Sequence, residues 1–265
     1  MPRKAREQSR TNIYHVMLRG INRQTIFEEE QDMNMFMTQL KRCKDISDFK
    51  LYAFCLMPNH VHLLMETGEE PLERIFKRLG GSYAIWYNRK YERVGHLFQD
   101  RFKSEKVENE PYFTTVFRYI MQNPMKAGLE SRPGTYKWSS FRAYERGAGT
   151  LTDTDYALTI FGRRETMIDF LCEENKDKAM DEDDTGPYLS DLEAKKFMEE
   201  LIHVSTIADF QKLREEEQRE NIRRMYEKGL PARQISRLTG RNRKTVTRIL
   251  GRPGGGPRGT VPLVP

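Results

Sequence analysis

Residues 49–67, FKLYAFCLMPNHVHLLMET, decide the fold, because they contain two β-type runs that meet at a Pro-Asn pair. Residues 49–57 are apolar on both faces, which is typical of a strand at the centre of a sheet. Pro58 and Asn59 predict a turn, and residues 60–67 predict the strand that follows. We therefore expect two consecutive strands of one sheet.

The segments on either side of this stretch alternate between strand and helix patterns. Residues 12–20 are a β-type run that ends at Gly20, and residues 30–46 place apolar side chains three and four apart, as an amphipathic helix does. Further on, we expect a helix over residues 71–91, a short strand over 102–107 and a helix that starts near Asn109. This order predicts an α+β domain with a mainly antiparallel sheet and packed helices, ending near residue 145.

The strand 60–67 carries two histidines, one residue apart. Because residues two apart in a strand point to the same face, His60 and His62 share one face, and Val61, Leu63 and Met65 point to the core. Their Cα atoms lie about 7 Å apart, so the two imidazoles can converge on one divalent ion. A hydrogen-bonded pair of histidines on a half-exposed strand explains the same spacing.

The predicted helix after Asn109 carries a second candidate pair. Tyr119 and Asn123 are four residues apart, so a phenol and an amide project from one helix face. The alternative is that Tyr119 packs in the core and that Asn123 caps the helix before Pro124.

Composition describes the whole chain. Its 265 residues include 45 Lys and Arg against 39 Asp and Glu, a net charge of +6, which favours a polyanionic partner. The three cysteines have no metal-ligand or redox spacing, which indicates a reducing compartment. No signal peptide and no apolar run of about eighteen residues is visible, so we expect a soluble cytoplasmic protein without a membrane partner.

Charge separates a second module from the first. Residues 173–200 hold eleven acidic side chains and four lysines, whereas residues 218–252 hold eleven Lys and Arg and two Glu. Residues 229–250, GLPARQISRLTGRNRKTVTRIL, place apolar residues and a Thr-Gly turn as a helix-turn-helix does, and a plain basic helical hairpin is the alternative. The second helix would turn five side chains toward DNA: Arg241, Arg243, Lys244, Thr245 and Arg248.

Four regions follow from these patterns. We expect the α+β domain over residues 1–145, a helical and acidic linker region over 146–200, a helical DNA-binding domain over 201–252, and a flexible Gly/Pro tail over 253–265.

Basic and amide side chains gather at the ends of two predicted strands. With Phe98 and Phe102 between them, they predict a groove for single-stranded or hairpin DNA, and an exposed strand edge kept soluble by charge is the alternative. His15 and His96 match no ligand spacing, so we interpret them as structural or DNA-contacting. The groove residues are Arg19, Asn22, Arg23, Gln99, Arg101 and Lys103.

Four motifs together resemble one family. MPNHVHLL (57–64), GHLFQDRFKS (95–104), YIMQNPMKAGL (119–129) and YKWSSFRAY (136–144) are similar to the REP-associated tyrosine transposases, a branch of the single-tyrosine HUH transposases of the insertion-sequence 200 type. The resemblance covers about residues 10–145, in order. It implies a ferredoxin/RRM-like HUH domain, here followed by a small all-α helix-turn-helix domain.

The resemblance also implies a reaction. His60, His62 and Asn123 would hold Mg²⁺ or Mn²⁺, and Tyr119 would attack a phosphate of single-stranded or hairpin (palindromic repeat) DNA, giving a 5′-phosphotyrosine and strand transfer. Tyr112, on the same helix face, competes for this role, and the four-residue spacing to Asn123 favours Tyr119.

Two other functions are compatible with the same sequence. One is a non-catalytic helix-turn-helix regulator derived from a transposase, and the other is a rolling-circle replication initiator or relaxase. The presence of all four expected site residues favours the enzyme over the regulator, and the single candidate tyrosine disfavours the initiator. Both a monomer and a homodimer are compatible with the sequence.

Overall fold

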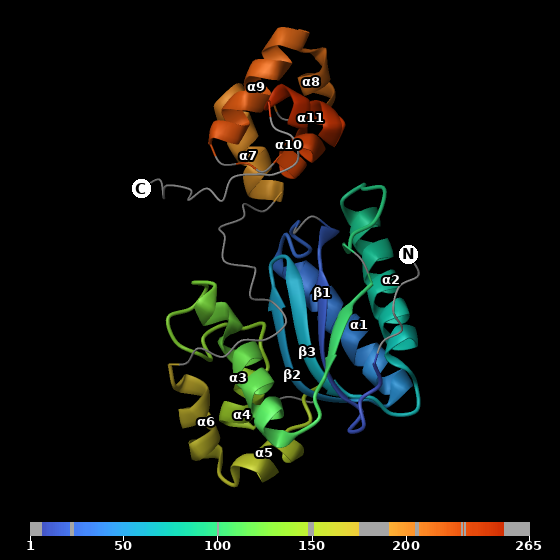
Figure 1. The fold of residues 1–265 in the computed structure, drawn as a ribbon, viewed down its shortest axis with the longest axis vertical. Coiled ribbons are helices and arrows are strands. Elements are labelled where there is room, and N and C mark those ends of the chain that lie inside the picture. Colours follow the sequence, from blue (N-terminus) through green and yellow to red (C-terminus); the bar gives the residue numbers. More distant parts are fainter. Residues whose placement is uncertain are drawn as a thin grey trace. The chain divides into compact units, whose positions relative to one another are not determined.

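The computed structural model describes residues 7–21, 24–99, 101–147, 151–174, 191–204, 207–228, 230 and 232–251. The chain divides into two compact units, Met1–Thr185 and Gly186–Pro265. Figure 1 shows the sheet in the first unit and a group of helices in the second.

A four-stranded antiparallel sheet is the centre of the first unit. Its strands are β1 (Ile13–Arg19), β2 (Lys50–Met57), β3 (His60–Glu66) and β4 (Lys103–Lys106), in the order β2-β3-β1-β4. Helices α1 (Glu30–Ser47) and α2 (Leu72–Lys90) connect β1 to β2 and β3 to β4. This βαββαβ order is the ferredoxin-like arrangement, so the expected α+β class and antiparallel sheet are confirmed.

Both faces of the sheet are covered. Figure 1 shows α1 and α2 on one side of the sheet and the helices from α3 to α6 on the other. On the first side, Val61, Leu63 and Met65 pack in one core with Phe36 and Tyr83, as expected. The four helices of the second side are α3 (Glu110–Lys126), α4 (Phe141–Arg146), α5 (Asp155–Phe161) and α6 (Arg164–Cys172).

The second core explains where the first unit ends. Phe113 and Phe117 of α3 pack against the sheet, and Ala157 of α5 and Leu171 of α6 are fully buried in the same cluster. The segment after residue 145, which the charge pattern assigns to a linker region, therefore begins with helices of the first unit. These helices shield apolar side chains of α3 that would otherwise face water.

The ends of α3 follow from its sequence. The Asn109 side chain accepts a hydrogen bond from the Tyr112 backbone N–H, and Pro111 lies in the first turn, so the expected start is confirmed. Pro124 lies in the last turn, and its carbonyl accepts from the Leu129 N–H at 2.8 Å.

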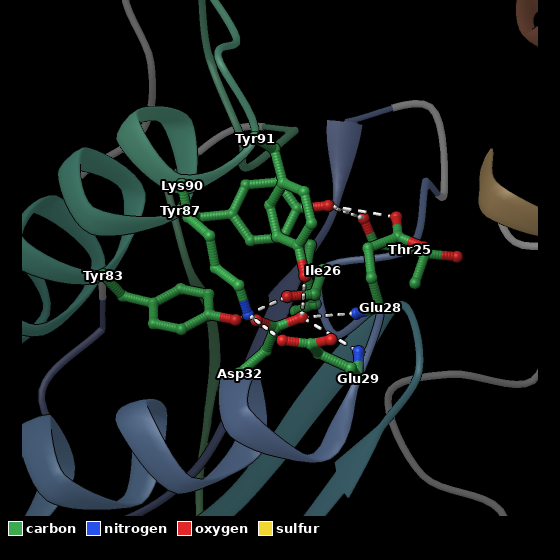
Figure 2. A network of polar contacts seen from close by, with 9 residues as sticks. All are labelled: Thr25, Ile26, Glu28, Glu29, Asp32, Tyr83, Tyr87, Lys90 and Tyr91. Carbon is green, nitrogen blue, oxygen red and sulfur yellow. Dashed lines mark hydrogen bonds and ion pairs between the residues drawn. The ribbon is translucent and has the colours of Figure 1, made fainter.

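A polar network holds the segment after β1 against α2 (Figure 2). Asp32, fully buried, accepts from the backbone N–H groups of Glu28 and Glu29, at 2.7 and 3.0 Å. Its two oxygens also accept from Lys90 at 2.6 Å and from the Tyr91 hydroxyl at 2.8 Å. On the same helix, Tyr83 donates to the Ile26 carbonyl and Tyr87 to the Thr25 carbonyl, so α2 fixes the path of residues 25–29.

The second unit is helical. Its core contains Phe210, Ile222, Met225, Ile235 and Val246. The turn expected at Thr239-Gly240 lies between the last two helices, where Gly240 has a φ of 65°, a value that favours glycine. The helices are α7 (Asp191–Ile202), α8 (Ile207–Lys212), α9 (Glu215–Glu227), α10 (Ala232–Thr239) and α11 (Arg243–Ile249).

Some expectations lie outside the described residues, among them the tail over 253–265 and most of the acidic stretch. In the part of the chain that the structure describes, no helix combines the length and the hydropathy that a membrane-spanning helix needs.

Candidate active site

The two histidines of β3 lie on the sheet face that is turned toward α3. His60 and His62 have ring centroids 4.8 Å apart, and the rings are nearly perpendicular, at 85°. They are 6% and 0% exposed, so the face is buried and the half-exposed strand of the alternative interpretation is wrong. The expected side of the strand is confirmed by Leu64, which belongs to the core beneath α3.

A third histidine, His15 of β1, joins this pair. It is 0% exposed, and its Nε2 lies 3.0 Å from Nδ1 of His62. In the β1–β3 register Met17 is opposite His62, so His15 is the diagonal neighbour of His62 on the same face. The spacing of residues along the chain does not predict this contact, because the pairing of β1 with β3 creates it. His15, Met17 and Arg19 alternate along β1 and so share one face, but only the register shows that this face meets His60 and His62.

Tyr119 of α3 lies against these histidines. Its ring centroid is 5.6 Å from that of His62, edge-on at 88°, and 6.1 Å from that of His15. The side chain is 7% exposed. The structure therefore brings together His60, His62 and Tyr119, which the sequence places about sixty residues apart. Asn123, 8% exposed, follows one helical turn after Tyr119.

Lys126, in the last turn of α3, is a further neighbour that sequence reasoning missed. Its Nζ lies 5.1 Å from the centroid of the Tyr119 ring. A cation over an aromatic face is attracted to it, and it also stabilises negative charge that develops on a phenol oxygen.

Burial keeps the two central histidines neutral. Burial lowers the pKa of His15 to about 3. Burial also lowers the pKa of His62 well below its usual value, and electrostatic repulsion between a protonated His62 and His60, His15 and Arg19 lowers it further. Both rings are therefore neutral imidazoles at pH 7, which is the form that binds metal ions.

The hydrogen bonds of these rings decide which nitrogens could hold a metal ion. Nδ1 of His60 donates to Oδ1 of Asn59 at 2.5 Å, because an amide oxygen only accepts. Nδ1 of His62 is engaged with His15. The nitrogen left to each ring for a metal ion is therefore Nε2, and His62 can use it only if its Nδ1 carries the hydrogen shared with His15.

The third ligand would have to be of another kind. Among the residues that the structure describes, no group of three or more His, Cys, Asp or Glu side chains is placed to hold a metal ion. Two imidazoles completed by the amide oxygen of Asn123 give mixed nitrogen and oxygen ligation, which fits Mg²⁺ or Mn²⁺ better than a closed zinc site.

The competing tyrosine has a structural contact. The Tyr112 hydroxyl donates to Oε2 of Glu105 in β4 at 2.7 Å. Burial, followed by this hydrogen bond, raises the pKa of Tyr112. This contact ties Tyr112 to Glu105 of β4, whereas the ring of Tyr119 lies against His62, so Tyr119 is the candidate nearer to the histidines.

Two of the expected DNA-binding segments meet at one end of the sheet. Arg19 is opposite His60 in the β1–β3 register, and its carbonyl accepts from the Gln99 N–H at 2.9 Å. Arg101 and Lys103, which follow Gln99, are exposed. The predicted cluster therefore lies at the histidine end of β1, while Asn22 and Arg23 fall outside the described residues.

The two aromatic residues between these side chains pack with side chains of α2. Phe102 is 7% exposed and its ring centroid lies 4.5 Å from that of Phe76. Phe98 packs on the same core, 6.4 Å from Tyr83. The expected place of Phe102 in the groove is therefore wrong, because its ring packs on Phe76 of α2, whereas Phe98 is only partly buried. His96 is exposed.

In the helical unit, the candidate side chains differ in their surroundings. The Arg241 guanidinium donates to Oε1 of Gln218 at 2.7 and 2.5 Å, so it ties the turn before α11 to α9. Arg243, Lys244 and Arg248 are exposed, and Thr245 is half-buried. The three exposed cations are the stronger candidates for contacts with DNA phosphates.

Comparisons with known proteins point to transposases. Residues 8–123 match the family model "Transposase IS200 like". A Haemophilus influenzae protein assigned as a REP-associated tyrosine transposase is 26% identical over 121 residues, which are 41% of this chain and 68% of that protein.

Two solved structures are similar in part. One is a REP-associated tyrosine transposase bound to a REP hairpin, with a TM-score of 0.47 and 19% identity over 58% of this chain and 94% of that chain. The other is a Deinococcus radiodurans protein assigned as a transposase, with a TM-score of 0.33 and 21% identity over 45% of this chain and 95% of that chain.

Proposed function

We propose that this chain, whose residues 8–123 match the model of IS200-like transposases, cleaves one DNA strand with Tyr119 and transfers it to another end. The observation that carries the proposal is the edge-on contact of Tyr119 with His62, 5.6 Å between ring centroids, beside His60. The contact supports the proposal because it brings the phenol of Tyr119 beside the buried face of β3 that carries both imidazoles.

The proposed metal site consists of Nε2 of His60, Nε2 of His62 and the Asn123 amide oxygen. A Mg²⁺ or Mn²⁺ ion bound there would neutralise charge on the scissile phosphate. The residues of the chain orient the site: Asn59 and His15 hold the two rings through their Nδ1 atoms.

The chemical step is a displacement at phosphorus. The Tyr119 oxygen forms a bond to the phosphorus while the bond to the 3′ oxygen breaks. The phenol gives its proton to solvent, and the departing 3′ oxygen takes up one proton, so the products are a 5′-phosphotyrosine and a 3′-hydroxyl. The covalent bond keeps the energy of the phosphodiester, and attack by a second 3′-hydroxyl rejoins the strand without ATP.

Two surfaces would bind the DNA. Arg19, Gln99, Arg101 and Lys103 lie along the histidine end of the sheet and would contact a single strand or hairpin. In the helical unit, the exposed cations of α11 would contact the phosphates of duplex DNA.

A covalent adduct tests the proposal. Full-length protein, a divalent ion and single-stranded hairpins from palindromic repeats should give a protein–DNA adduct that survives denaturation. Tyr119→Phe removes only the hydroxyl, so the adduct should vanish while DNA affinity persists. Tyr112→Phe is the matched control and should form the adduct.

Two results would count against the enzyme. An adduct that maps to any other tyrosine would overturn the assignment of Tyr119. No adduct with the wild type, across metals and hairpins, would favour a DNA-binding regulator derived from a transposase.

A further inference from the structure

The contact between His15 and His62 requires one proton in a defined place. The two nitrogens, Nε2 of His15 and Nδ1 of His62, are 3.0 Å apart, and both rings are 0% exposed. A hydrogen bond of this length between two imidazoles needs a hydrogen on one nitrogen and a lone pair on the other. Water cannot replace either partner at such a buried position.

The two possible arrangements differ in what His62 can do. If His62 donates, its Nδ1 carries the hydrogen and its Nε2 keeps a lone pair. If His15 donates, the single hydrogen of neutral His62 is on Nε2, and that nitrogen cannot bind a metal ion. The direction of this one hydrogen bond therefore decides whether His62 is a ligand.

We propose that His15 is a positioning residue: its Nε2 accepts from Nδ1 of His62 and so keeps the Nε2 lone pair of His62 available for a divalent ion. The inference rests on the metal site proposed above. His15 touches neither the ion nor the DNA in this role.

The neighbouring ligand supports this assignment. Asn59 gives His60 the same kind of acceptor, an oxygen 2.5 Å from its Nδ1. Both proposed ligands thus have an acceptor on Nδ1, one from the β2–β3 turn and one from β1. The Asn59 carbonyl also accepts from the N–H of Gly20, the residue just after β1, at 2.9 Å. This bond helps to hold Asn59, the acceptor for His60, in place.

Two substitutions of His15 separate its hydrogen bond from its volume. His15→Phe keeps a ring against Tyr119 and His62 but has no acceptor. His15→Gln places an amide group near the position of Nε2, and its oxygen can accept from His62. His96→Phe is the matched control, because His96 is an exposed histidine of the same unit.

The test is Mn²⁺ binding to the full chain without DNA, measured by calorimetry or from the electron paramagnetic resonance signal of free Mn²⁺. We expect His62→Ala to lose binding and His96→Phe to bind as the wild type does. His15→Phe should bind about 10- to 100-fold more weakly, as after loss of a partner that orients a ligand, and His15→Gln should recover most of the affinity. Circular dichroism of each variant verifies folding.

The outcomes are distinguishable. If His62→Ala binds Mn²⁺ like the wild type, the proposed metal site is wrong and this inference falls with it. If His62→Ala loses binding but His15→Phe keeps full affinity, only the inference is overturned. Equal loss in folded His15→Phe and His15→Gln would show that the ring itself, and not its acceptor, is needed.

A second measurement does not depend on any variant. Nitrogen-15 NMR of the wild type with Mg²⁺ reports which ring nitrogen of His15 carries hydrogen. Hydrogen on Nδ1 of His15 supports the proposal, and hydrogen on Nε2 overturns it even if His15→Phe fails to fold.

Discussion

Lys126 lies over the face of the Tyr119 ring, with its ammonium nitrogen 5.1 Å from the ring centroid. The two residues are seven apart on α3, so the contact spans the last two turns of the helix, where Pro124 also lies. In the proposed reaction, a positive charge at this position would stabilise negative charge on the Tyr119 oxygen, both in the attack and in the rejoining step.

Loss of this charge should slow the chemistry. We expect Lys126→Met to form the adduct about tenfold more slowly at neutral pH, the effect of a one-unit change in the pKa of a nucleophile. Lys126→Arg should retain most of the rate. Lys137→Met is the matched control, since Lys137 also lies over an aromatic ring, Trp138, at 4.8 Å. The measurement is the single-turnover rate of adduct formation; equal rates for Lys126→Met and the wild type would exclude the role.

The buried histidines should make stability depend on pH. Burial lowers the pKa of His15 to about 3 and that of His62 well below 6.5. In the unfolded chain both take up protons below about pH 6.5, whereas the folded chain does not, so acid favours unfolding. When the pH falls from 6.5 to 5.5, each such histidine should lower the free energy of unfolding by about 1 kcal/mol.

Substitution of His15 measures how much this residue contributes to the pH dependence of stability. In urea titrations at the two pH values, His15→Phe should lose about 1 kcal/mol less than the wild type over this interval. His96→Phe should show the pH dependence of the wild type. A pH dependence that His15→Phe leaves unaltered would mean that His15 gains a proton in the folded protein too.

The network around Asp32 should contribute strongly to the stability of the first unit. Asp32→Asn removes the charge that faces Lys90 and replaces an oxygen acceptor in a fully buried position. We expect the free energy of unfolding to fall by about 3 kcal/mol, as when one partner of a buried ion pair is lost. Asp45→Asn, which removes an exposed pair with Lys41, should cost under about 0.5 kcal/mol. Similar costs for the two variants would contradict this prediction.

The helical unit should contribute to the salt dependence of DNA binding. Full-length protein with Arg243→Ala and Lys244→Ala should bind long duplex DNA more weakly. The slope of log K against log salt should fall by about 0.9 for each DNA phosphate that the variant no longer neutralises. Arg223→Ala with Arg224→Ala is the matched control, because it removes the same charge from exposed positions of α9. An identical slope in wild type and α11 variant would mean that α11 does not contact phosphate.

Local patterns predict most of the first unit. Apolar runs and the Pro58-Asn59 turn place β2 and β3, and Asn109 and Pro111 place the start of α3, because each signal acts within a few residues. The pairing of Tyr119 with the histidines followed from resemblance and not from spacing.

What could not be predicted depends on contacts between distant segments. The hydrogen bond between His15 and His62 arises from the β1–β3 register, and no pattern within either strand predicts it. Phe102 is flanked by the charged residues Arg101 and Lys103, as a groove residue would be, and only its packing against Phe76 of α2 shows that it is buried. The helices after residue 145 were assigned to a linker because their sequence does not reveal the apolar surface of α3 that they cover.

The alternation of β3 has an evolutionary consequence. His60 and His62 face α3 while Val61 and Leu63 face the opposite core, so a shift of one residue would exchange the two histidines for hydrophobic side chains. An insertion or deletion within β3 would therefore destroy folding and the histidine pair together. A related chain that lost the histidine pair but kept the fold would therefore have lost it by substitution. Among related chains that have lost the site, those of unchanged length in which a histidine or the tyrosine is replaced would be the ones that the host has kept for another function.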